Sequence, residues 1–151
     1  MQVSRAIILP AMKEEVWAVL MDWERQADWM RDADGVRVVS RERAGVGVRL
    51  AVRTRLFGIP AFTEPMEVTL WDPPATMTIR HAGPVAGTGT WTLEPVEAGT
   101  RFTWTEDVEL AVPMVGAIAA RLYRPMLGRS MDGAMQGLRR YIIARGPLRH
   151  D

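Results

Sequence analysis

The sequence predicts an α+β fold in which a curved antiparallel sheet wraps around a long C-terminal helix. Residues 35–110 alternate apolar and polar side chains with a period of two and are divided by turns rich in glycine and proline, which is typical of consecutive strands. After residue 113 the apolar side chains recur at helical spacing. A length of 151 residues is ordinary for one domain, so we expect residues 1–151 to form a single domain.

The first elements are predicted to be a strand and two short helices. Residues 3–9 form an apolar, β-branched run, which is typical of a strand. Residues 12–21 carry apolar side chains at helical spacing and acidic residues in the first turn, where the helix dipole favours negative charge. Residues 23–30 predict a second short helix, in which Trp29 is a large apolar anchor.

The middle of the chain predicts a meander of consecutive strands. Together with the first strand, the turns delimit about seven strands with short connections, which makes neighbouring strands antiparallel. One face of each strand is apolar and the other is polar, so we expect only one face of the sheet to be covered. The same alternation predicts that Leu70 faces inward and Trp71 outward.

The last element is predicted to be a long helix that packs on the apolar face of the sheet. Pro113 is a favoured residue at a helix start. Pro125 should kink or break the helix and several glycines weaken it, so packing on the sheet must hold it. The apolar residues close to helical spacing are Val115, Ile118, Leu122, Met131, Met135, Leu138 and Ile142.

The composition excludes several classes of function. Hydrophobic residues make up 48% of the chain and charged residues 25%, a balance typical of a globular protein. The formal net charge of +1 argues against nucleic acid or an anionic membrane as a partner. The absence of cysteine excludes disulfides, thiolate nucleophiles, zinc ribbons and iron–sulfur clusters.

No segment of the sequence predicts secretion or membrane insertion. The apolar run at residues 6–9 is too short for the core of a signal peptide. No apolar stretch reaches the length of a membrane span. We therefore expect a cytoplasmic protein.

Four stretches of the chain occur in an order and spacing that are fairly specific when taken together. They are IILPAMKEEVWAVLMDWERQADWM, GVGVRLAVRT, VTLWDPPATMTI and GTGTWTLEPVEAGTRFTWTEDVEL. Over nearly the whole chain this series resembles the START-type helix-grip superfamily, also called SRPBCC or the polyketide cyclase/dehydrase and lipid transport proteins. The resemblance implies a helix-grip fold and a hydrophobic cavity for a lipid, quinone or polyketide-like molecule. It does not select one function, because one fold serves several.

Strand alternation places four polar residues on the predicted inward face, namely Thr54, Glu64, His81 and Glu106. An inward carboxylate among apolar side chains is costly unless it is paired or protonated. Glu64 and Glu106 therefore indicate a polar anchor for a ligand or a general acid or base; alternatively, each lies at a strand end, solvated or paired with arginine. His81 is a proton shuttle, a ligand donor or an ordinary satisfied side chain.

The turns also predict which of these residues lie near one another. A tight turn at residues 58–60 would place Thr54 opposite Glu64. A tight turn at residues 73–74 would place His81 diagonal to Glu64 on the next strand, within reach of long side chains.

The candidate ligand-binding residues combine these polar positions with apolar ones. Trp91 and Trp104 are predicted to face inward on adjacent strands, next to space left by Gly87 and Gly89, although core packing is the more common explanation for inward tryptophans. The full candidate set is Trp29, Thr54, Phe62, Glu64, Met66, Ile79, His81, Trp91, Trp104, Glu106, Leu122 and Met126.

We expect neither a metal ion nor a cofactor. No HxxxH or HExxH spacing is present, and a metal site would require Glu64, His81 and Glu106 to converge. The sequence also lacks a GxSxG elbow, a phosphate-binding glycine loop and a dinucleotide fingerprint.

Three functions are compatible with these patterns. The leading hypothesis is a non-catalytic binder or carrier of a small hydrophobic molecule, because a cavity is predicted and no catalytic motif is present. The second is a cyclase or aromatase in which Glu106, Glu64 or His81 moves protons. The third is a ligand-sensing regulatory or interaction protein, which a large apolar surface patch would favour.

Overall fold

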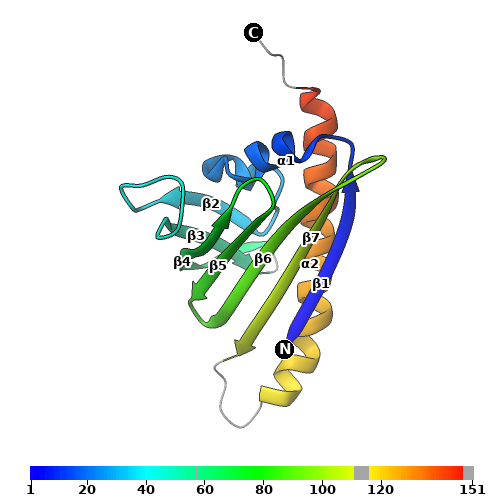
Figure 1. Ribbon diagram of the computed structural model, residues 1–151. Coiled ribbons are helices and arrows are strands. Elements are labelled where there is room, and N and C mark those ends of the chain that lie inside the picture. The colour runs from blue at the N-terminus through cyan, green and yellow to red at the C-terminus, as the bar shows by residue number, and fades with distance from the viewer. Residues whose placement is uncertain (57, 111–115, 148–151) are drawn as a thin grey trace.

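The computed structural model describes residues 1–56, 58–110 and 116–147 (Figure 1). Pro113 and Val115, at the predicted start of the last helix, lie outside the described residues. The elements in chain order are β1 (Gln2–Leu9), α1 (Lys13–Leu20), the 3₁₀ helix η1 (Trp23–Asp28), β2 (Ala33–Val38), β3 (Arg49–Leu56), β4 (Ile59–Asp72), β5 (Thr76–Ala82), β6 (Val85–Val96), β7 (Gly99–Leu110) and α2 (Gly116–Arg145).

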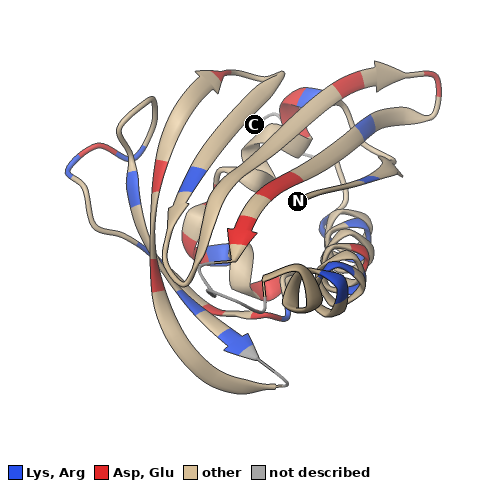
Figure 2. Ribbon diagram, turned by 90° about the horizontal axis from the view of Figure 1, so that it is seen from below, with Lys and Arg blue, Asp and Glu red and all other residues tan. Residues whose placement is uncertain are grey.

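The strands form one antiparallel sheet of seven strands in the order β1-β7-β6-β5-β4-β3-β2. Strands β2 to β7 are the predicted meander, and β1 pairs with β7 along its whole length, from Gln2 opposite Asp107 to Leu9 opposite Thr100. The sheet curves around α2, as the view along the helix shows (Figure 2). This arrangement is the predicted helix-grip fold, with the core between the concave face of the sheet and the helix.

The buried stripe of α2 explains how the sheet holds a weak helix. Its buried residues are Gly128, Met131, Ala134, Met135, Leu138 and Ile142. Pro125 lies inside α2, which runs through it as one helix rather than breaking there. Packing therefore overrides the local preference of proline to end a helix, as expected for an element held by its apolar face.

The prediction that the apolar residues in the first half of α2 face the sheet is wrong. Ile118 and Leu122 are 67% and 72% exposed. The nine positions from Leu122 to Met131 correspond to two and a half turns at about 100° per residue, so the two side chains lie on opposite sides of the helix. Because Met131 belongs to the buried stripe, Leu122 faces away from the sheet.

The prediction that Trp71 faces outward is also wrong. The pairing of β4 with β5 shifts register between Val68 and Leu70, which is a β-bulge. A bulge of one residue reverses the alternation, so Leu70 is 43% exposed and Trp71 turns to the core. There the Trp71 ring meets Trp17 edge-on at a centroid distance of 5.2 Å.

One glycine allows α2 to approach the N-terminal helices closely. A Cβ atom added at Gly137 would lie 2.3 Å from the backbone oxygen of Trp29. Gly133, one turn earlier on the same helix, has open space where a Cβ would be added. Gly137 is therefore required by packing, whereas Gly133 only weakens the helix.

We expect the two glycines to respond oppositely to alanine. Gly137→Ala forces the helix away from Trp29 and should lower the free energy of unfolding by about 1–3 kcal/mol. Gly133→Ala should raise it by up to about 1 kcal/mol, since alanine is the better helix former. Urea unfolding followed by circular dichroism measures both. Equal effects of the two substitutions would contradict the close packing at Gly137.

Candidate functional site

A cavity of about 420 Å³ lies between the concave face of the sheet and α2. Its apolar wall includes Met30, Phe62, Val85, Trp104, Val108, Met126, Leu127 and Met131. Its polar lining consists of Asp32, Thr54, Arg55, Glu64, His81, Glu106, Tyr123 and Ser130. A smaller chamber of about 70 Å³ shares Met30, His81, Trp104 and Glu106 with it and extends toward Trp91. His81 and Glu106 are thus the polar residues that both spaces share.

Three titratable side chains from three strands form a cluster in the cavity wall, Glu64 on β4, His81 on β5 and Glu106 on β7. The Nδ1 atom of His81 lies 3.6 Å from Oε1 of Glu64, and its Nε2 atom lies 3.2 Å from Oε2 of Glu106. Glu64 and Glu106 are only 6% and 5% exposed, so both carboxylates belong to the cavity rather than to a solvated strand end. The imidazole ring therefore lies between two buried acids.

The sheet register explains the first of these contacts. His81 is directly opposite Met66, so Glu64 is its diagonal neighbour on β4, as predicted. The predicted pairing of Thr54 with Glu64 is wrong, because Thr54 is opposite Phe62 and Glu64 is opposite Val52. The predicted turn included Ile59 and Pro60, but these residues are opposite Leu56 and Arg55 in the sheet, so the strands pair in a different register.

The contact between His81 and Glu106 depends on a glycine in the strand that separates them. Gly89 on β6 is opposite Glu106 on β7 and has no side chain to block the approach from β5. A Cβ atom at Gly89 would lie 2.6 Å from Oε1 of Glu106 and 3.2 Å from Nε2 of His81. The space predicted beside Gly89 is therefore present and is filled by the cluster.

The cluster has both satisfied and unsatisfied polar atoms. The indole N–H of Trp104 donates a hydrogen bond of 2.6 Å to Oε1 of Glu106. By contrast, Oε1 of Glu64 and Nε2 of His81 are buried and have no hydrogen-bond partner within the described part of the chain. Nε2 is close enough to Glu106 for an ion pair, but its N–H is not aimed at the carboxylate. Buried atoms of this kind are uncommon, and they lie where a bound molecule would meet them.

The carboxylates determine the charge of His81. Burial alone lowers the pKa of His81, but the contacts with Glu106 and Glu64 outweigh burial and raise it to about 10. The imidazole therefore carries a proton on both nitrogens at neutral pH. Burial, and then the negative charges of Glu106, Glu64 and Asp32, raise the pKa of Tyr123 to about 12, so its hydroxyl stays protonated.

The structure brings most of the predicted residues to these two spaces. The cavity is lined by Thr54, Phe62, Glu64, His81, Trp104, Glu106 and Met126. The smaller chamber is lined by Met66, Ile79 and Trp91, together with His81, Trp104 and Glu106. Trp29 lines neither space and is buried against Trp91 at a centroid distance of 6.0 Å. Leu122, predicted to line the cavity, is on the exposed side of α2.

The sequence-based prediction missed Tyr123, Leu127 and the polar residues Asp32, Arg55 and Ser130. Leu127 precedes Met131 by four residues and so shares its helical face, which was a usable signal. No pattern in the sequence indicated Asp32, because it lies between elements.

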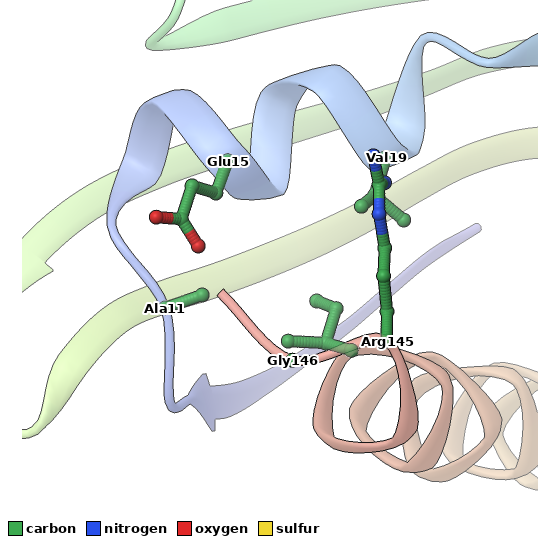
Figure 3. Close-up of a pocket in the computed structure, with 6 residues that line it drawn as sticks. Ala11, Glu15, Val19, Arg145 and Gly146 are labelled. Carbon is green, nitrogen blue, oxygen red and sulfur yellow. The ribbon is translucent and has the colours of Figure 1, made fainter. Parts of the chain in front are cut away.

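A second hollow lies elsewhere, between α1 and the C-terminal end of α2 (Figure 3). Glu15 and Arg145 are on its wall, together with Ala11, Val19, Ile142 and Gly146. Its volume is about 10 Å³, which is space for a single water molecule. It is too small for an organic ligand.

Residues 1–56, 58–110 and 116–147 contain neither a candidate metal centre nor a candidate membrane-spanning helix. No group of three or more His, Asp and Glu side chains there is arranged to hold a metal ion, although Glu64, His81 and Glu106 do converge. No helix in these ranges is long and apolar enough to cross a membrane.

The raised pKa of His81 predicts how stability depends on pH. The protonated ring contributes stability that is complete below about pH 6.5 and is lost as the pH rises toward 10. At neutral pH, His81→Gln should lower the free energy of unfolding by about 3 kcal/mol, because it leaves two buried acids unpaired. The difference between wild type and variant should shrink between neutral pH and pH 10 in urea unfolding experiments. A constant difference across this range would contradict the ion cluster.

The comparisons with known proteins agree with this architecture. Residues 1–142 match the family model described as polyketide cyclase/dehydrase and lipid transport. No curated protein matches the chain.

Solved structures share the fold at low sequence identity. A protein from Thermus thermophilus is 22% identical with a TM-score of 0.82, and the match covers 97% of this chain and 99% of that one. A START superfamily protein from Mycobacterium smegmatis is 14% identical with a TM-score of 0.75, covering 96% and 99%. The Zhui aromatase/cyclase from a Streptomyces species is 16% identical with a TM-score of 0.73, covering 91% and 90%.

At these identities the solved structures show the fold alone. The family model matches nearly the whole sequence. The chain belongs to the polyketide cyclase/dehydrase and lipid transport family.

Proposed function

We propose that the protein binds a small, largely apolar molecule in the cavity between the sheet and α2. The observation that carries this proposal is a cavity of about 420 Å³ whose walls are mainly apolar and in which Glu64, His81 and Glu106 converge. Small-molecule sites typically have volumes of roughly 300–1,000 Å³ and this combination of lining groups. The apolar part of the ligand would lie against Trp104, Val108 and Met126, and its polar group would meet the cluster of Glu64 and His81.

A catalytic role of the cyclase or dehydratase type is the second candidate. It is favoured by three titratable side chains buried in the wall of a ligand-sized cavity. Because the pKa of His81 is raised to about 10, its ring would donate a proton at neutral pH, and Glu64 or Glu106 would have to act as the base. Simple binding remains the leading proposal because both ring nitrogens of His81 already face carboxylates.

The identity of the ligand can be sought directly. Native mass spectrometry of the purified protein, followed by solvent extraction and mass analysis, should reveal a reproducible copurifying molecule with a large apolar part. An empty protein that also fails to bind the neutral fluorescent probe Nile red would contradict the proposed function.

A pair of tryptophan substitutions on α2 tests whether binding occurs in this cavity. Met126 lines the cavity, whereas Leu122, one turn earlier, is 72% exposed. Met126→Trp fills the space and should weaken Nile red binding at least about tenfold, or about 1.4 kcal/mol. Leu122→Trp adds the same ring outside and should leave binding unchanged. Similar effects of both variants in a fluorescence titration would place the binding site elsewhere.

The substitution Glu106→Gln tests the catalytic alternative. If the extracted molecule is converted to a product by the protein, Glu106→Gln should reduce the rate by about 100-fold or more, the usual contribution of a positioned acid or base. Turnover that survives this substitution would remove Glu106 from the reaction.

A further inference from the structure

The ion cluster contains a buried hydrogen-bond acceptor without a donor, on a residue that lines the cavity. Glu64 is 6% exposed, and its Oε1 atom has no hydrogen-bond partner among the residues described. The nearest charged nitrogen, Nδ1 of His81, is 3.6 Å away. Glu106 differs, because Trp104 donates to one of its oxygens. A buried carboxylate oxygen without a donor is costly, and a donor on a bound molecule would remove that cost.

Two donors without a hydrogen-bond partner in the described residues also belong to side chains that line the cavity, Nε2 of His81 and Nε of Arg55, but both side chains are already paired with a carboxylate. Nε2 of His81 lies 3.2 Å from Oε2 of Glu106 and is therefore already held by an opposite charge. A ligand carbonyl at this nitrogen would compete with a carboxylate. A donating group on the ligand therefore meets less competition in the cluster than an accepting group does.

The formal charges of the cavity wall favour the same kind of group. Asp32, Glu64 and Glu106 carry three negative charges, against two positive charges on Arg55 and His81. Arg55 is moreover paired with Asp34, which does not line the cavity. Asp32 is exposed and the Arg55 side chain is partly exposed, so solvent screens both charges. The enclosed cluster of Glu64, Glu106 and His81 keeps a formal charge of −1 where screening is weak. A cationic group is attracted there and an anionic group is repelled.

We propose that the ligand of this cavity is an apolar amine whose ammonium group donates hydrogen bonds to Glu64 and Glu106. This inference rests on the proposed function, because it names the chemical class of the molecule bound. An ammonium group has three donors and no acceptor, so it complements the two carboxylates of the cluster and Oε1 of Glu64, which is unpartnered among the described residues. A fatty acid would instead bring another negative charge against two buried acids.

Three probes with the same hydrocarbon chain test the head group. Isothermal titration calorimetry at neutral pH would compare decylamine, decanol and decanoate, with wild-type protein, Glu64→Gln and Glu109→Gln. Glu109 is an exposed residue of the same sheet on β7, so its substitution controls for the change in total charge. We expect decylamine to bind at least about tenfold more tightly than decanol, and decanoate to bind most weakly.

The two variants test whether Glu64 causes the preference for the amine. Glu64→Gln should weaken decylamine binding about tenfold and change decanol binding much less, because only the charged hydrogen bond is lost. Glu109→Gln should leave all three affinities unchanged. If Glu64→Gln does not fold, the order of the three affinities measured with the wild-type protein still tests the inference.

Each other outcome overturns the inference. Decanoate binding as tightly as decylamine, or a decylamine preference that survives Glu64→Gln, would exclude an amine held by these acids. If Nile red and decanol bind without any preference for the amine, the inference fails while the proposed function stands. If none of the probes binds, including Nile red, both fail.

Discussion

A protonated imidazole between two buried carboxylates is the interaction on which the cavity depends. Each of Glu64, His81 and Glu106 would be costly alone among apolar side chains, and together they offset one another. The arrangement gives the cavity a polar end. It also explains why the tryptophan at position 104 faces inward, since its indole N–H satisfies one oxygen of Glu106.

The topology of the sheet makes this cluster possible. Strands β4 and β5 are neighbours, so Glu64 and His81 meet as a diagonal pair, whereas β5 and β7 are separated by β6. Only a residue without a side chain at Gly89 lets His81 reach Glu106 across that strand. The long helix then closes the concave face, and its inward residues Met126 and Tyr123 complete the wall. The strand register of the sheet therefore also places the residues of the site.

The sequence was sufficient for the elements and for part of the site. Regular alternation identified the inward positions of Glu64, His81 and Glu106, and a tight turn predicted the diagonal contact of the first two. Alternation failed where a β-bulge in β4 interrupts it, which misplaced Trp71. The partner of Thr54 was misplaced because Ile59 and Pro60 belong to the strand rather than to the turn. Helical spacing failed at Leu122. The apolar residues of α2 lie on two opposite sides of the helix, both with helical spacing, and only packing on the sheet determines which side is buried. The contact across Gly89 is long-range and could not be read from local patterns.

The protonation state of His81 is the most direct test of this account. Nitrogen NMR of protein labelled in its histidines, with His81→Gln used to assign the signal, reports whether both ring nitrogens carry a proton. The account predicts an imidazolium at neutral pH that loses its proton only near pH 10. A neutral imidazole at pH 7 to 8 would contradict the ion cluster and, with it, the charged anchor proposed for the ligand.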